Sequence, residues 1–479
     1  MFEQVEDLGI LYPSLFARYV QKDPEVLSCF AVPYQEMGVY RQLAARLAES
    51  PPWQLPKKLV AKQNEGILKN QSRLSRLLKK KILDENTLFV ITGQQPGLLT
   101  GPVYGIYKAM TAVKLAARLE EQLQRPVQPL FWIAGEDHNV FDLVRLFLLD
   151  SQGKLARVRL NFPGFGPPVG EICLDQDDML AVLKRLEELT PQSPYKNEVL
   201  QSLREITIHS STMTDWFAGL MQLLFHQHKL ALLDPLDLSK NGAYIPLLLK
   251  TVELGPQIHQ CLDSAEKSLA QKGFSPQVDR TGQESFLMIV WEGRRYALYR
   301  DGDTFFTAKG ELSLTRYELI SMFQSEPWRF SPNVLLRPLF QDSLFPNLAY
   351  IPGPGELAYF TQLQEVYRLF GLEMPVLFPR LGVTLLEAWQ KELQQKHGFS
   401  FADALTYASS ACEDPAKKEG EPVEKEMIRH YVWPRCRPQE RVFNLFPFLL
   451  RHGWPFWEDF SRNFPEQEGH YLYSLGSER

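Results

Sequence analysis

The sequence lacks the segments that send a protein into or across a membrane. No stretch of its 479 residues approaches the ~18 consecutive apolar residues of a transmembrane helix. The N-terminus, "MFEQVEDLGI", is acidic and has neither the basic start nor the apolar core of a signal peptide. We therefore expect a cytoplasmic protein with no membrane partner.

Cysteine is scarce and is not spaced for metal binding. The five cysteines are far apart and form no CxxC pair; they are Cys29, Cys173, Cys261, Cys412 and Cys436. This pattern fits a reducing compartment and argues against a structural zinc site. We predict no metal site.

Familiar catalytic signatures are missing as well. There is no G-x-S-x-G elbow, and no cysteine has a convincing histidine partner nearby in sequence, which disfavours acyl-enzyme hydrolysis. The glycine-rich stretch "TGQQPGLLTGP" (92–102) is not a P-loop, because Pro102 rather than Lys follows Gly101. Its glycine spacing also differs from G-x-G-x-x-G. Any anion bound here is held without a Walker lysine.

The overall composition is that of a globular protein. Hydrophobic residues make up 44% of the chain, charged residues 23% and aromatic residues 12%. The net charge of −5 is a poor match for nonspecific nucleic-acid binding, so we expect no nucleic-acid partner. Residues 57–81 differ, with nine Lys or Arg against one acid. That block is either a solvated helix face or a contact for a polyanion.

Apolar runs predict an α/β fold with a parallel sheet. A strand at 86–93, a helix at 103–120 and a strand at 126–138 make a βαβ unit, whose sheet is buried on both faces. Two more buried strands are predicted at 229–235 and 374–380. Together they indicate a Rossmann-like core with α/β insertions.

The remaining pattern suggests how the chain is divided. Residues 284–312 alternate and carry turn signals, which predicts an antiparallel meander. Further helices are predicted at 176–190, 197–206, 213–228, 256–272 and 356–370. We expect a core over 1–380 with inserted subdomains at about 145–228 and 280–330, a helical arm over 381–430 with a helix near 383–396, and a segment over 431–479 that returns to the core.

Two predicted strands end in polar turns, where parallel α/β sheets bind ligands. After the first strand, the side chains of Thr92, Gln94 and Gln95 offer hydrogen bonds, and glycines at 93, 97 and 101 allow close backbone approach. A purely structural turn is the alternative. Lys108 lies about two turns inside the next helix, so it reaches a ligand only if that helix leans toward the crevice.

The second turn, "AGEDHN" (134–139), sets two carboxylates beside an imidazole. Glu136, Asp137, His138 and nearby Asp142 could supply a general base or bind a ligand, although their spacing is no recognisable metal set. A third polar stretch, 335–362, leads through "PGPGE" into a helix. Its candidate substrate-binding residues are Arg337, Gln341, Asp342, Tyr350, Glu356 and Tyr359, for which a structural role is equally open.

These stretches together resemble the BshC family of bacillithiol-biosynthesis enzymes. The family pattern TGQQxGLxTGPxYxxYKAxTAxKLA is matched from Thr92, with Gly93, Gly97, Gly101, Tyr104, Lys108 and Lys114 in place. PxFWxAxEDHD is matched at 129–138, and LRPxxQDxLxPxxAYxxGPGExAY at 336–359. "PQERVFNLFPFLLRHG" resembles the family's QERxxN segment.

The resemblance implies a ligase with a core similar to class I nucleotidyl transferases and a coiled-coil arm. Its expected reaction joins L-cysteine to the amine of glucosaminyl malate, with the cysteine carboxyl activated by ATP or another nucleotide. Asp137, His138, Gln94 and Gln95 are then the expected catalytic group, and the other candidates bind substrate. A homodimer through the arm is also implied.

Two departures from the family pattern keep alternatives open. Asn139 stands where the family has Asp, and 381–430 is short for a coiled coil of three or four heptads. The alternatives are a class I-like aminoacyl or nucleotidyl transferase acting on another acceptor, such as RNA, and a non-catalytic nucleotide- or sugar-binding relative.

Overall fold

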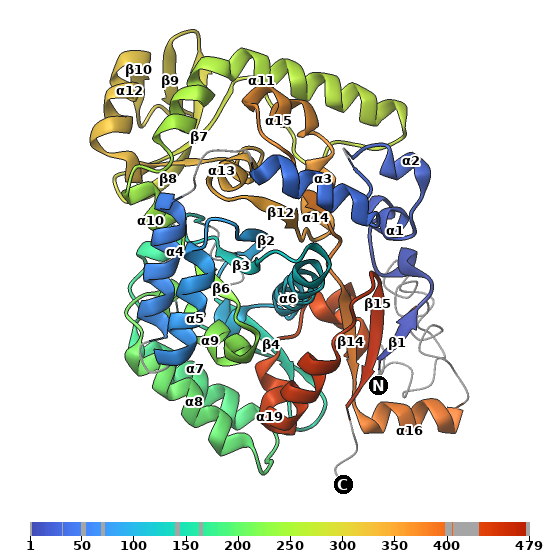
Figure 1. Ribbon diagram of the computed structural model, residues 1–479. Helices are drawn as coiled ribbons and strands as arrows, with labels where there is room; N and C mark the ends of the chain where they lie inside the picture. The colour runs from blue at the N-terminus through green and yellow to red at the C-terminus, as the bar shows by residue number, and fades with distance from the viewer. Residues whose placement is uncertain are drawn as a thin grey trace.

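The computed structural model describes residues 2–30, 32–48, 54–68, 72–138, 144–161, 166–397, 405 and 431–475. At its centre is a five-stranded, fully parallel sheet with helices on both sides (Figure 1). The strands lie in the order β13 (Val376–Leu377), β12 (Asn347–Tyr350), β2 (Leu88–Gln94), β3 (Val127–Ile133) and β6 (Ala231–Leu233).

In chain order these strands read 3-2-1-4-5 from the β6 edge, so the direction of winding reverses between β2 and β12. Every residue of β3, β6 and β12 is buried, as expected for strands covered on both faces. The predicted α/β, Rossmann-like fold is confirmed. Four of the strands lie at the predicted positions, whereas β12 has no counterpart among the predictions.

Helix α6 (Tyr104–Leu123) joins β2 to β3 and packs on both strands. Its start and length match the predicted helix at 103–120. Close approach of the two strands requires Gly93, because a Cβ there would come 2.7 Å from the Trp132 carbonyl oxygen. The helices that precede the sheet are α1 (Ser14–Val20), α2 (Pro24–Leu27), α3 (Met37–Ala48), α4 (Gln54–Ile67) and α5 (Ser72–Leu83).

Between β3 and β6 the chain forms a two-stranded ribbon, β4 (Arg145–Leu149) and β5 (Leu155–Arg159), followed by three helices. These helices are α7 (Gln176–Leu189), α8 (Lys196–His209) and α9 (Met213–Phe225), close to their predicted ranges. After β6 come α10 (Leu236–Lys240) and α11 (Ile245–Gln271). Helix α11 begins about three turns earlier than predicted, because Gly255 and Pro256 lie inside it rather than at its start.

The predicted meander is an antiparallel sheet in the order β10-β9-β8-β7-β11. Its strands are β7 (Glu284–Trp291), β8 (Arg294–Asp301), β9 (Thr304–Thr307), β10 (Ser313–Thr315) and β11 (Phe330–Pro332). It is completed by α12 (Arg316–Ser325). The chain then returns to the parallel sheet through α13 (Arg337–Leu344) and β12.

After β12, the region expected as one helix over 356–370 forms two, α14 (Pro354–Phe360) and α15 (Gln364–Phe370). The start of the expected arm differs too, because Gly382–Leu386 is a strand, β14, followed by α16 (Ala388–His397). Most of the remaining arm, through residue 430, lies outside the described residues, as do Asn139 and Asp142.

The ends of the chain meet in a third sheet. Strand β15 (His470–Ser474) pairs antiparallel with β1 (Phe2–Val5) and parallel with β14. Helix α19 (Phe446–Asn463) precedes β15 and packs near the start of α6 and against α8 (Figure 1). Among the described helices, none is both long and apolar enough to cross a membrane.

Candidate active site

A cavity of about 950 Å³ opens at the carboxyl ends of β2, β3 and β12. This is where the sheet reverses its winding, the position at which open parallel sheets bind ligands. One wall is formed by Gly93–Gln95, Ala134, Glu136, Asp137 and Tyr350, from the three strand ends. The opposite wall comes from α1, the loop after α11 and the antiparallel sheet. The three polar stretches singled out in the sequence therefore share one cavity.

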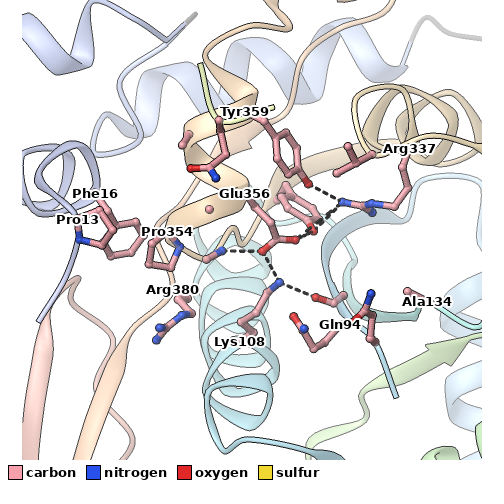
Figure 2. Close-up of a pocket in the computed structure, with 18 of the residues that line it drawn as sticks. Pro13, Phe16, Gln94, Lys108, Ala134, Arg337, Pro354, Glu356, Tyr359 and Arg380 are labelled. Atoms are coloured by element: carbon pink, nitrogen blue, oxygen red, sulfur yellow. Dashed lines mark hydrogen bonds and ion pairs between the residues drawn. The ribbon is translucent and has the colours of Figure 1, made fainter. Parts of the chain in front are cut away.

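Glu356 lies at the centre of a network of hydrogen bonds on this cavity (Figure 2). Its Oε2 accepts hydrogen bonds from Lys108 Nζ at 2.5 Å and from the Gly353 amide at 2.7 Å. Its Oε1 accepts one from Tyr350 Oη at 2.6 Å. The Gly353 contact places the carboxylate over the first turn of α14, where a negative charge is favoured.

Lys108 reaches the cavity from α6, so the helix does lean toward the crevice. Its Nζ also donates to the Gly93 carbonyl at 2.5 Å, and its side chain is 1% exposed. Burial lowers the pKa of Lys108, and the carboxylate of Glu356 offsets part of that effect. Burial by itself would raise the pKa of Glu356, but the charges of Lys108 and Arg337 bring it below its ordinary value. Geometrically the two groups form an ion pair, with Lys108 Nζ 2.5 Å from Glu356 Oε2.

Arg337, the first residue of α13, closes the other side of this network. Its Nη2 donates to Tyr350 Oη and Tyr359 Oη, each at 3.1 Å, and lies 3.9 Å from Glu356 Oε1. Its Nη1 donates to Gln341 Oε1 at 3.3 Å. The arginine is thus fixed in place by groups that themselves line the cavity.

Gln341 and Asp342 are buried behind Arg337 and do not line the cavity. The Asp342 carboxylate accepts hydrogen bonds from Gln341 Nε2 at 2.9 Å, Asn347 Nδ2 at 2.7 Å and Tyr367 Oη at 2.5 Å. Burial raises the pKa of Asp342 to about 6 in spite of these donors. Both residues therefore support the site from behind.

The turn after β3 holds Asp137 firmly. Its carboxylate accepts hydrogen bonds from Gln95 Nε2 and from the His138 amide at 2.7 Å, and lies 3.4 Å from Arg295 Nη1. Burial would raise the pKa of Asp137, but hydrogen bonds from His138 and Gln95 and the charge of Arg295 hold it below its ordinary value. His138 lies beside Asp137 with its side chain 43% exposed, outside the lining of the main cavity.

The loop after β2 has two halves with different surroundings. Gly93, Gln94 and Gln95 line the cavity, where Gln94 Nε2 donates to Tyr104 Oη at 2.9 Å. Residues 97–101 instead meet the C-terminal segment. There Asn444 Nδ2 donates to the carbonyls of Leu98, Leu99 and Gly101, and the Val103 amide donates to the Phe443 carbonyl at 2.8 Å.

This second half has a constrained backbone. Leu99, Thr100 and Gly101 have φ values of 49°, 71° and 71°, in the left-handed region that costs a non-glycine residue about 1 kcal/mol or more. Gly101 borders a separate cavity of about 120 Å³ together with Arg145, Arg435, Arg437 and Arg441. Thr92, also predicted as a site residue, is buried in β2, where its hydroxyl donates to the Ile351 carbonyl at 3.0 Å.

Several cavity residues were not predicted. The arginines among them are Arg295 on β8, Arg380 after β13 and Arg441 after the arm; Phe16 and Phe274 add aromatic surface. Arg380 is held by a buried ion pair with Glu440, with Nη2 and Oε1 2.5 Å apart. Arg441 and Glu440 belong to the QERxxN match, which was the one available signal for them. Arg295 lies in the meander, and nothing in its local sequence marks it.

Five basic side chains line the cavity against three acidic ones. The basic residues are Lys108, Arg295, Arg337, Arg380 and Arg441, and the acidic residues are Glu136, Asp137 and Glu356. Such a surface suits a substrate with several carboxylates or phosphates. Within the described chain, no group of three or more His, Cys, Asp or Glu residues is arranged to hold a metal ion.

The described residues of the basic block at 57–81 belong to α4 and α5 (labelled in Figure 1), and none of them lines the cavity. Lys57 is buried and its Nζ donates to the carbonyls of Asp84, Glu85 and Thr87. Lys79 and Lys81 form ion pairs with Glu65 and Glu120. At least three of the nine basic residues thus have structural partners.

The fold and cavity define a Rossmann-like α/β protein with a cavity rich in basic side chains at the reversal point of its sheet. The family model "Bacillithiol biosynthesis BshC, N-terminal Rossmann-like domain" matches residues 5–381, and the chain belongs to this family.

Similar proteins carry the same family name. One from Heliobacterium modesticaldum is 31% identical, over 94% of this chain and 95% of its own length. One from Desulforamulus reducens is 28% identical, over 81% and 84%, and one from Natranaerobius thermophilus 34%, over 66% and 58%. Each is called "Putative cysteine ligase BshC".

Proposed function

We propose that this protein is a ligase that joins L-cysteine to the amine of glucosaminyl malate, forming the amide bond of bacillithiol. The observation that supports this most directly is the convergence of the three family motifs on one cavity with an excess of basic side chains. The malate part of the acceptor carries two carboxylates, which match such a lining. The names of the relatives agree with the proposed donor.

In this proposal the basic residues bind the anionic groups, and the fixed polar groups orient the reactants. Arg337 and Lys108 are positioned by Glu356 and the two tyrosines. Arg295 and Arg441 come from other segments and also line the cavity. Gln95, Asp137 and His138 form a polar anchor at the end of β3. Holding the amine and the carboxyl carbon together supplies the proximity that amide formation needs.

The cysteine carboxyl has to be activated, and we propose ATP or another nucleotide as the source of the activating phosphate. The start of α6, a common phosphate site, is covered here by the Phe443 carbonyl. The phosphates would therefore be held by the side chains of Lys108, Arg295 and Arg441 rather than by the helix N-terminus. Bound there, the nucleotide would convert the carboxyl into a mixed anhydride.

The test is product formation by the purified full-length protein with cysteine, glucosaminyl malate and ATP. Mass spectrometry should detect bacillithiol and either AMP or ADP. A Lys108→Met variant should form at least about tenfold less product, since it removes the buried cation of the site. A Lys240→Met variant, on α10 outside the cavity, is the matched control. Absence of product with every nucleotide, together with salt-sensitive RNA binding, would favour the transferase alternative.

A further inference from the structure

Glu136 and Asp137 are adjacent carboxylates with different surroundings. Both line the cavity at the end of β3. The turn that carries them is rigid, because the Gly170 amide donates to the Gly135 carbonyl at 2.8 Å and the Val169 amide to the Asp137 carbonyl at 2.8 Å. A Cβ at Gly135 would lie 2.6 Å from Asp234 Oδ1, so the turn needs glycine there. The backbone position of Glu136 is therefore fixed.

Asp137 is occupied by protein donors, whereas Glu136 is almost free of them. Gln95, the His138 amide and Arg295 all contact the Asp137 carboxylate. Glu136 receives a single long hydrogen bond from Tyr244 Oη, 3.4 Å from its Oε2, and forms no ion pair within 4.0 Å with a described residue. The residue is 5% exposed. A carboxylate with unused acceptor positions on a cavity wall is available to a ligand.

The surroundings of the two carboxylates also shift their pKa values in opposite directions, upward for Glu136 and downward for Asp137. Burial raises the pKa of Glu136 to about 7, against the opposing charges of Arg295 and Arg337 and with a smaller contribution from the carboxylates of Asp234 and Asp137. The packed neighbours that face it are these four groups and the Tyr244 hydroxyl. A general base works best when its pKa is near the operating pH, and Asp137 is far below that range.

We infer that Glu136, rather than Asp137 or His138, is the general base that takes the proton from the attacking amine of the amino sugar. This rests on the proposed ligase function. As the amine nitrogen forms its bond to the cysteine carboxyl carbon, the carbon–oxygen bond of a cysteinyl mixed anhydride with phosphate breaks. The phosphate departs with that electron pair, and one N–H proton moves to a Glu136 carboxylate oxygen.

The inference assigns a different task to each side chain of the turn. Asp137 and His138 hold Gln95 and Arg295 in position, and Glu136 acts on the substrate. Tyr244 is a positioning residue, because its hydroxyl contacts Glu136 without lining the cavity.

The decisive measurement is the pH dependence of turnover for the wild type and for Glu136→Gln, which keeps the shape and removes the basic oxygen. The wild-type kcat should rise with pH through about 7, since the base must be ionised. Glu136→Gln should lower kcat at least about 100-fold, leave the KM values within about threefold and abolish the acid limb. Glu205→Gln, on the exposed side of α8, is the matched control.

A second variant keeps the test valid if Glu136→Gln does not fold. Tyr244→Phe removes the hydrogen bond that favours the ionised carboxylate, so the acid limb of the kcat profile should move to higher pH. Turnover of Glu136→Gln within about threefold of wild type, or a Tyr244→Phe profile identical to wild type, would overturn the assignment of the base. If the wild type makes no bacillithiol, the ligase proposal itself fails. The ionisation of Glu136 can then be tested separately, from the infrared difference between wild type and Glu136→Gln as a function of pH. We expect the carboxyl to ionise near pH 7. A pKa near the ordinary value of 4.5 would overturn the inference.

Discussion

The loop after β2 contributes one half to the cavity wall and the other half to the contact with the C-terminal segment, and the polar groups of the two halves have different partners. Around Gly93–Gln95, polar side chains face a cavity and keep some of their hydrogen-bonding capacity for a ligand. Around Leu98–Gly101, Asn444 uses all its polar atoms on the backbone, donating to three carbonyls and accepting from the Phe446 amide. One half of this motif therefore lines the cavity and the other half is a structural joint, and substitutions should separate the two.

The largest effect on stability is expected at the buried ion pair behind the C-terminal contact. Glu440→Gln leaves the Arg380 charge buried without its counter-ion, which should cost about 3–5 kcal/mol of the free energy of unfolding. Urea denaturation measures this. Glu187→Gln breaks a surface pair with Arg204 and should cost less than about 1 kcal/mol. Equal losses in the two variants would contradict the assignment of a structural role to Glu440.

The next effect concerns the cavity wall and has a pH dependence of defined sign. The pKa of Glu136 rises from 4.5 to about 7 on folding, so the folded state binds the proton more tightly. Its contribution to stability is present below about pH 4.5 and is lost as the pH rises toward about 7. The free energy of unfolding of Glu136→Gln, relative to that of wild type, should therefore increase by about 3 kcal/mol between about pH 4 and pH 8. Denaturation at several pH values checks this, and a constant difference would contradict it.

A smaller loss is expected at the joint itself. Asn444→Ala removes the side-chain donor to the Leu99 and Gly101 carbonyls and should lower the free energy of unfolding by about 2 kcal/mol; the Leu98 carbonyl keeps its bond from the Gly101 amide. Turnover per folded molecule should change little, since Asn444 lies outside the main cavity. Asn463→Ala, at the exposed end of α19, removes contacts to Asp459 and is the control. A large loss of turnover with unchanged stability would place Asn444 in the active site.

The smallest effect on stability is expected on the cavity-facing half of the loop. Gln94→Ala should change the free energy of unfolding by less than about 0.5 kcal/mol, because its side chain is half-buried and makes one hydrogen bond to Tyr104. Turnover should fall by about tenfold or more. Thermal denaturation and steady-state kinetics of Gln94→Ala and of the exposed Gln201→Ala separate the two effects. Unfolding of Gln94→Ala would show that this half is also structural.

The sequence predicted the parts of the fold that local pattern controls. Continuous apolar runs located β2, β3, β6 and β13, because a strand buried on both faces is mostly apolar along its whole length. Strand β12 was missed because it is only four residues long and is flanked by polar and proline-rich sequence. That strand determines where the cavity lies, because the direction of winding reverses between β2 and β12.

The candidate site was predictable where a motif sits at a strand end, and less so elsewhere. Lys108, Glu356 and Arg337 were found in motifs, and the structure brings them together. Arg295 reaches the cavity only because the antiparallel sheet folds over it, and no local signal records that contact. Residue type alone could not show that Asp137, rather than Glu136, is bound by protein donors. That difference depends on Gln95 and on Arg295, which lies far along the chain.

The contact between Gly101 and Asn444 also has a consequence for the order in which the chain matures. The two residues are 343 positions apart in sequence. At roughly 5–20 residues per second of synthesis, the loop waits about 20 to 70 s for its partner to be made. Until then the left-handed turn at 99–101 has its local bond from the Gly101 amide to the Leu98 carbonyl but not its contacts with Asn444. The β1 strand likewise waits for β15. The cavity is also completed late, because Arg441, which lines it, and Glu440, which pairs with Arg380, are made long after the first motif.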